Sequence, residues 1–110
     1  MPEKSDLSVL ICTGVNEINA VIAAKYAREG FGLVTVVSNQ YNTLKAFHKA
    51  LLALSPQIVI LGPECMAGKY IELIRAECGG GKYKKQKPYH PPMPEIRHVN
   101  IYVELNEINS

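Results

Sequence analysis

The sequence predicts an α/β fold built on a mostly parallel sheet. Three apolar runs, at residues 9–12, 33–37 and 58–61, lack polar alternation, which is typical of strands covered on both faces. Segments with apolar residues at helical spacing follow each of the three runs. A regular succession of strand and helix favours parallel strands joined by right-handed crossovers.

The first helix is expected over residues 17–29. Asn16 is a plausible N-cap, because its side chain can accept a hydrogen bond from a free amide of the first turn. Gly30 is the natural stop, since glycine adopts the left-handed conformation without a Cβ clash. The apolar stripe of this helix consists of Ile18, Val21, Ile22 and Tyr26.

Two further helices complete the three strand–helix units. The second ends at about Leu54, before Ser55 and Pro56, and its inward residues are Leu44, Phe47, Leu51 and Leu54. The third is expected over residues 66–78, before three consecutive glycines, with Ile71, Ile74 and Cys78 on one side.

A basic loop is expected at about residues 79–97. It carries Lys82, Lys84, Lys85 and Lys87, with tyrosines at 83 and 89, and shows no periodicity. Lysines and tyrosines can contact phosphates and stack on bases. Four lysines in such a loop are more often a solvated tether, which is the interpretation favoured here.

The last strand is predicted by strict alternation. Val99, Ile101, Val103 and Leu105 alternate with polar residues, so this strand has one buried and one wet face and belongs near the sheet edge, unlike the three apolar runs. Its direction is left open by the long loop before it. Because an exposed edge strand is a template for another chain, we expect self-association or docking of a protein partner here.

The complete prediction is one domain over residues 1–110. It is a three-layer, flavodoxin-like sandwich whose four strands take the order 2-1-3-4. The net charge of +2 argues against nucleic acid as a partner, and no apolar run is long enough for a membrane span. The three cysteines match neither a redox motif nor a zinc site, which favours reduced thiols and a cytoplasmic location. No metal or cofactor is expected.

Small and polar residues follow the three apolar strands, where open α/β sheets bind their ligands. Their backbone amides and hydroxyls could hold a small polar ligand, although the same residue types serve ordinary turns and caps, the interpretation favoured here. Glu17 could also approach this edge. The candidate ligand-binding residues are Thr13, Gly14, Asn16, Ser38, Asn39, Gly62 and Glu64.

Cys12 and the histidines are the other candidates for chemistry. Cys12 could be a nucleophile activated by the first helix N-terminus, but a small buried side chain is the favoured interpretation. His48, His90 and His98 have no evident carboxylate or cysteine partner, and His48 is expected on the solvent side or flank of its helix. No catalytic role is assigned to any of them.

About two-thirds of the chain resembles a bacterial response-regulator receiver domain. The similar stretches are residues 16–19, 26–35, 54–61, 66–68 and 71–75. Receivers place two acids after the first strand to hold Mg²⁺, where this chain has approximately Thr13 and Gly14. They place the phosphoaccepting aspartate at the end of the third strand, where this chain has Gly62. The resemblance therefore implies a pseudo-receiver that has lost phosphoryl transfer.

Two other families are similar in part. The cellobiose-type IIB components of the phosphotransferase system have a cysteine at the end of strand one, as Cys12 is here, and residues 60–63 resemble their third strand. That resemblance implies a phosphocarrier, although Glu17 would oppose the bound anion. PII-like sensors also have a mobile loop before a final strand, which implies a small-molecule or nucleotide sensor. The hypothesis taken forward is a non-catalytic regulatory module that acts through protein contacts.

Overall fold

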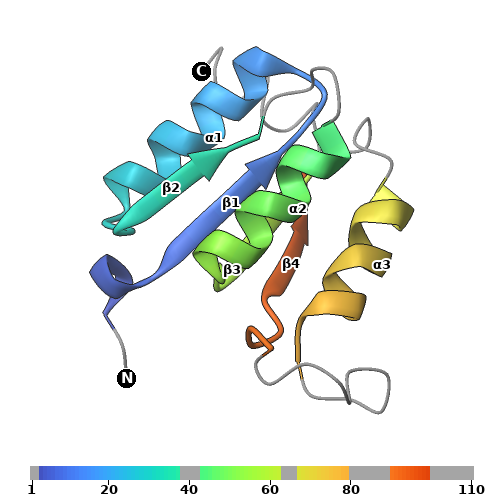
Figure 1. Cartoon of the computed structure of the whole chain (residues 1–110). Helices are drawn as coiled ribbons and strands as arrows, with labels where there is room; N and C mark the ends of the chain where they lie inside the picture. The colour runs from blue at the N-terminus through green and yellow to red at the C-terminus, as the bar shows by residue number, and fades with distance from the viewer. Residues whose placement is uncertain (1–2, 38–42, 63–66, 80–89, 100–110) are drawn as a thin grey trace.

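Four parallel strands form a single sheet in the computed structural model (Figure 1). The structure describes residues 3–37, 43–62, 67–79 and 90–99. The strand order is β2-β1-β3-β4. The fold is thus a flavodoxin-like α/β fold, and the predicted order 2-1-3-4 is confirmed. The strands are β1 (Ser8–Cys12), β2 (Leu33–Val36), β3 (Ile58–Leu61) and β4 (Glu95–His98).

Three α-helices cover the two faces of this sheet. They are α1 (Asn16–Arg28), α2 (Thr43–Leu54) and α3 (Ala67–Glu77). A short 3-10 helix, η1 (Lys4–Asp6), precedes β1. The described helix ends lie within one or two residues of the predicted ones, which is the ordinary uncertainty of helix boundaries.

Each face of the sheet has its own apolar core. On one face α1 packs Ile18, Ile22 and Tyr26 against Val9, Ile11, Ile58 and Ile60. On the other face α2 and α3 cover the alternate strand residues. This second cluster contains Leu10, Cys12, Val37, Phe47, Leu51, Val59, Leu61, Tyr70, Ile74 and Cys78. One helix therefore serves one face and two helices serve the other, which makes the three layers predicted from the sequence.

The helix stops follow the predicted chemistry. Gly30 ends α1 with a φ of 98°, a conformation that a residue with a Cβ rarely adopts. Ser55 ends α2 with a φ of 44°, and its amide donates to the Leu51 carbonyl at 3.1 Å. Pro56 follows at once and cannot continue the helix.

The position predicted for the last strand is wrong at its start. The last three residues of the expected loop at 79–97 belong to β4 (Glu95–His98), which pairs in parallel with β3. Glu95 and Arg97 lie in register with Ile58 and Ile60, on the α1 face, and both are exposed. Because polar residues occupy that face, β4 lacks the alternation that marks a half-buried strand. Of the strand predicted from Val99 to Leu105, residues 100–105 lie outside the described part of the chain.

β2 is an edge strand, as the predicted order 2-1-3-4 requires, although its apolar run had been grouped with strands that lie away from an edge. Within the described strands it pairs with β1 alone. Leu33 and Val36 are exposed, and the two residues between them are half-buried. An uninterrupted apolar run was thus no sign of an interior position in this sheet.

The two described ends of the basic segment are held together. The Gly79 amide donates to the Pro91 carbonyl at 2.6 Å, and Gly79 has a φ of 72°. Both residues lie between the end of α3 and the start of β4, at the amino ends of the parallel strands. The lysines at 82, 84, 85 and 87 are outside the described residues. The attachment points of their segment and the turns after β1 and β3 therefore lie at opposite ends of the sheet.

Candidate functional site

The turn between β1 and α1 is the part of the carboxyl edge that the structure describes best. Thr13 is fully buried and Asn19 is 2% exposed. The Thr13 amide donates to Asn19 Oδ1 at 3.0 Å, and Asn19 Nδ2 donates to the Thr13 carbonyl at 3.3 Å. One amide side chain thus satisfies both backbone groups of Thr13.

The Thr13 hydroxyl is also engaged within the turn. It donates to the Val15 carbonyl at 3.0 Å, and the Val15 amide approaches the same oxygen at 3.2 Å. The Thr13 amide and hydroxyl and the Val15 amide, which could have received an anion in a phosphate-binding loop, are therefore already paired with protein atoms.

Asn16 was expected to cap α1, and that prediction is wrong. Val15 occupies the N-cap position with extended backbone and makes no side-chain cap. Asn16 is the first helical residue and is exposed. Thr13 and Asn19 secure the helix entry in its place. Glu17 lies in the first turn of α1, as predicted.

Gly62 lies directly against Thr13 at the end of β3. Its amide donates to the Cys12 carbonyl at 2.9 Å. A Cβ on Gly62 would lie 2.7 Å from Thr13 Cβ and 3.0 Å from Thr13 Cγ2. No side chain fits at this position unless the neighbouring turn shifts. A side chain at the end of β3 is thus sterically excluded by Thr13 in the present arrangement of the turn.

The structure brings together some of the candidate binding residues. Thr13 and Gly62 are in contact, while Gly14 and Asn16 continue the same turn. Ser38, Asn39 and Glu64 lie outside the described residues. In the described ranges, no group of three His, Cys, Asp or Glu side chains is placed to hold a metal ion. The described turn after β1 therefore consists of neutral groups that hydrogen-bond to one another, and the acid that follows it is Glu17 in the first turn of α1.

Cys12 lies in the core. Its side chain is fully buried in the cluster that α2 and α3 form with the sheet. Neither Cys12 nor Cys78 takes part in a disulfide. A thiol at this depth is accessible to a phosphoryl donor only after local opening of the core.

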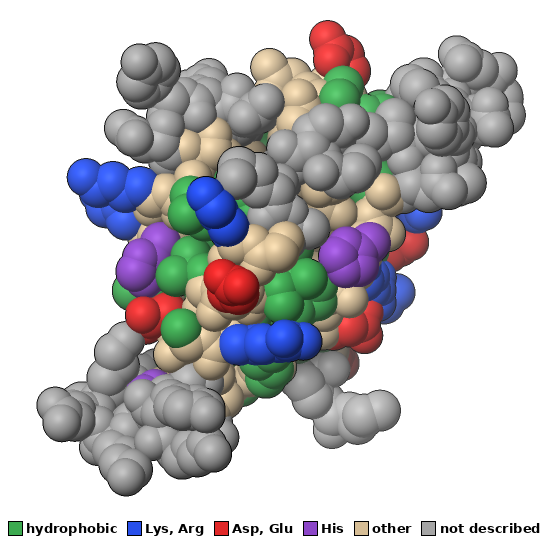
Figure 2. All heavy atoms as spheres, turned by 90° about the vertical axis from the view of Figure 1, so that its right-hand side faces the viewer, with side chains coloured by type: hydrophobic (Ala, Val, Ile, Leu, Met, Phe, Trp, Pro, Cys, Tyr) green, Lys and Arg blue, Asp and Glu red, His purple; other side chains and the backbone are tan. Residues whose placement is uncertain are grey.

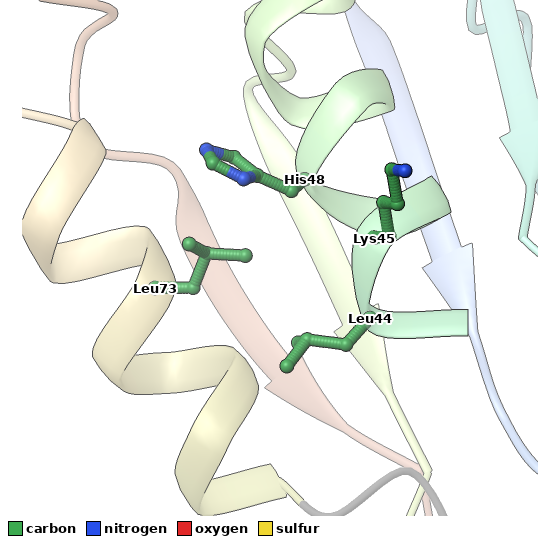
Figure 3. Close-up of a pocket in the computed structure, with 4 residues that line it drawn as sticks. All are labelled: Leu44, Lys45, His48 and Leu73. Carbon is green, nitrogen blue, oxygen red and sulfur yellow. The ribbon is translucent and has the colours of Figure 1, made fainter. Parts of the chain in front are cut away.

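An open groove of about 390 Å³ lies between α2 and α3 (Figure 3). Leu44 and His48 point from α2 toward α3, and Leu73 points back from α3. Lys45 completes the lining, which is mostly apolar. Sequence reasoning placed Leu44 inward, whereas 38% of it is exposed at this groove. The first turn of α2 extends beyond the core that Phe47 and Leu51 fill.

His48 has a carboxylate neighbour that the sequence did not reveal. Its Nε2 lies 3.5 Å from Oε1 of Glu77, which comes from the last turn of α3. The two residues are 29 positions apart, so only the packing of α2 beside α3 brings them together. This pair brings a side chain of α2 within 3.5 Å of one from α3.

Arg97 makes another contact between distant elements. Its Nη1 donates to the Tyr26 hydroxyl at 2.5 Å, and its Nε donates to Glu95. The hydrogen bond to Glu95 raises the pKa of the Arg97 guanidinium, burial lowers it, and the Tyr26 hydroxyl adds a further raising effect. Arg97 thus connects β4 to the last turns of α1. The β4 residues on this face of the sheet are Glu95 and Arg97, so no apolar side chain of β4 makes that connection.

The face that carries α3 shows charges of both signs between apolar atoms (Figure 2). Neither sign forms a continuous patch among the residues described on that face. No helix in the described ranges is both long and apolar enough to cross a membrane. The described residues on this face therefore form no strongly basic surface.

Asn19 is the residue of this turn that sequence reasoning did not single out. It lies on the buried side of α1 with Ile18, Ile22 and Tyr26. An amide inside an apolar helical stripe must find hydrogen-bond partners, and the nearest unpaired backbone is the turn before the helix. The position of an asparagine within this apolar stripe was therefore the sequence signal for its hydrogen bonds to the turn.

A scan of protein-family models finds no match to this chain, and searches of curated proteins and of solved structures find none either.

Proposed function

We propose that this chain is a receiver-like, non-catalytic regulatory module that acts through protein–protein contacts. One observation carries the proposal: the turn after β1 is closed by its own hydrogen bonds, and Gly62 fills the space beside it without a side chain. Phosphoryl transfer in a receiver needs carboxylates that hold Mg²⁺ and an accepting carboxylate. In the proposed receiver-like interpretation, Thr13 and Gly62 correspond to two of those positions, and neither carries a carboxylate.

The described surface supports contact as the mode of action. Large apolar side chains are exposed on β2, on α2 and before β4: Leu33, Val36, Leu44, Leu52 and Met93. Isolated exposed apolar residues are common in proteins, so only those that lie together on one helix or strand support a contact surface. β2 and α2 each carry two.

The experiment is incubation with acetyl phosphate and Mg²⁺, or with a phosphohistidine donor, followed by intact mass measurement. An active receiver domain treated in parallel is the positive control. We expect no mass gain. A gain that disappears in the Cys12→Ser variant would identify the IIB-like phosphocarrier instead. A gain that persists in Cys12→Ser would show that another residue is phosphorylated, which would contradict the proposal.

A further inference from the structure

Among the described residues, no strand pairs with the outer side of β2. The strand reads Leu-Val-Thr-Val and contains no charge and no proline. Leu33 is 47% exposed and Val36 is 38% exposed. Natural proteins usually protect an edge with lysines, prolines, bulges or very short strands, because unpaired backbone groups accept another strand. β2 is four residues long and has no such charge or proline.

The ladder with β1 shows which backbone groups point outward. The Leu33 amide donates to the Leu7 carbonyl at 3.4 Å, and the Val37 amide donates to the Ile11 carbonyl at 2.8 Å. Backbone groups of successive residues in a strand alternate between its two sides. The N–H and C=O groups of Val34 and Val36 therefore point away from β1.

The other edge of the sheet is different. β4 carries Glu95, Arg97 and His98. Charged side chains on an edge disfavour pairing with a second strand. A second strand therefore pairs more readily with β2 than with β4. Self-association was first expected at Val99–Leu105, of which residues 100–105 lie outside the described part of the chain.

We propose that two copies of this chain pair through β2, antiparallel, about a twofold axis perpendicular to the sheet. In this register Val34 of one copy lies opposite Val36 of the other, and Thr35 meets its own equivalent at the axis. The outward groups of the two valines then exchange both backbone hydrogen bonds. Opposed β-branched residues and a Thr–Thr pair are favourable cross-strand neighbours. The product is one continuous sheet of eight strands.

The charges of α1 fit the same symmetry. α1 packs over β2 and β1 (Figure 1), so a twofold axis beside β2 sets the two α1 helices next to each other and antiparallel. The first turn of α1 carries Glu17, and its last turn carries Lys25 and Arg28. Each acidic end then faces a basic end. Because an isologous interface must complement itself, this arrangement favours a second copy over an unrelated chain.

The first test is molar mass by light scattering over a concentration series. We expect the mass to approach twice the monomer value of 12.2 kDa as concentration rises. Val36→Lys should abolish this increase, whereas Val36→Thr, which keeps a β-branched side chain, should retain it. A monomer at every concentration would refute the proposal. A dimer that persists unchanged in folded Val36→Lys would also refute it.

The second test does not depend on how well Val36→Lys folds. A Thr35→Cys variant should form an intermolecular disulfide on mild oxidation, since residues directly opposed in an antiparallel pair bring their Cβ atoms within about 4.5–5.5 Å. Ala53→Cys, at an exposed position on α2, is the matched control for random thiol oxidation. Covalent dimer from Thr35→Cys well above that from Ala53→Cys and from the unsubstituted chain supports the proposed register. Equal yields would overturn it. The dimer proposal rests on β2, whereas the proposed function rests on the absence of phosphoryl transfer at the turn after β1. The inference therefore goes beyond the proposed function and can fail separately from it.

Discussion

The turn after β1 and the outer side of β2 differ in whether their backbone N–H and C=O groups are paired within the molecule. At the turn, Asn19 pairs with both the amide and the carbonyl of Thr13. At the edge, Val34 and Val36 direct theirs away from the only described neighbouring strand. Buried polar groups must be paired within the molecule, whereas exposed ones remain available to a partner. At the turn after β1 the described backbone groups of Thr13 are paired within the molecule, whereas no described strand pairs with the outward groups of β2.

Removal of Asn19 should have the largest effect. In Asn19→Ala, the buried amide and carbonyl of Thr13 lose their partner, and each unsatisfied group costs about 1–3 kcal/mol. We expect the free energy of unfolding, measured in urea, to fall by at least this amount.

Asn16→Ala is the matched control for that experiment. Asn16 is exposed at the first position of α1, so its substitution should change stability by less than about 0.5 kcal/mol. Equal losses in the two variants would mean that the turn is not held by Asn19.

A side chain at position 62 should be the next most damaging change. Gly62→Ala places a Cβ 2.7 Å from Thr13 Cβ, and such overpacking costs about 1–3 kcal/mol. Gly68→Ala provides a control of opposite sign, because that helical glycine has nothing within 4 Å of an added Cβ. It should stabilise the protein by up to about 1 kcal/mol. A stable, unperturbed Gly62→Ala protein would show that the carboxyl edge has room for a functional side chain.

The smallest effect concerns the charges across the proposed dimer. Glu17→Lys should weaken dimerisation only a few-fold, because exposed ion pairs contribute about 0.2–1 kcal/mol. Combining it with Arg28→Glu should recover affinity, and added salt should reduce both differences. Dissociation constants from sedimentation would measure them. If the double variant loses as much free energy of dimerisation as the two single variants lose together, the antiparallel placement of the two α1 helices is wrong.

Periodicity was enough to predict most of the fold. The unbroken apolar runs identify β1, β2 and β3, and glycine at position 30 and proline at position 56 mark where helices stop. β4 could not be found in this way. Its α1-side residues, Glu95 and Arg97, are exposed, and Arg97 instead contacts Tyr26 from α1. On its other side β4 places a single apolar residue, Ile96, against the core, which is too little to make an apolar pattern in the sequence.

The site was predictable only in outline. The rule that ligands bind at carboxyl ends identified Thr13 and Gly62, and the structure places them in contact. The sequence could not show that Asn19 reaches back to the turn. It also could not show that Glu77 lies beside His48, since that contact depends on how two helices pack. Side-chain partners that come from different elements require tertiary geometry, which no local pattern encodes.

The most direct test of the closed rim is an NMR titration of the amide resonances of Thr13, Val15 and Gly62. Mg²⁺ would be added first, and acetyl phosphate or inorganic phosphate afterwards. Because the Thr13 and Gly62 amides are bonded to protein atoms and Val15's faces the Thr13 hydroxyl, we predict that none of the three shifts with either addition. Saturable shifts centred on these amides would contradict the account, since they would show an ion held where the structure closes the turn on itself.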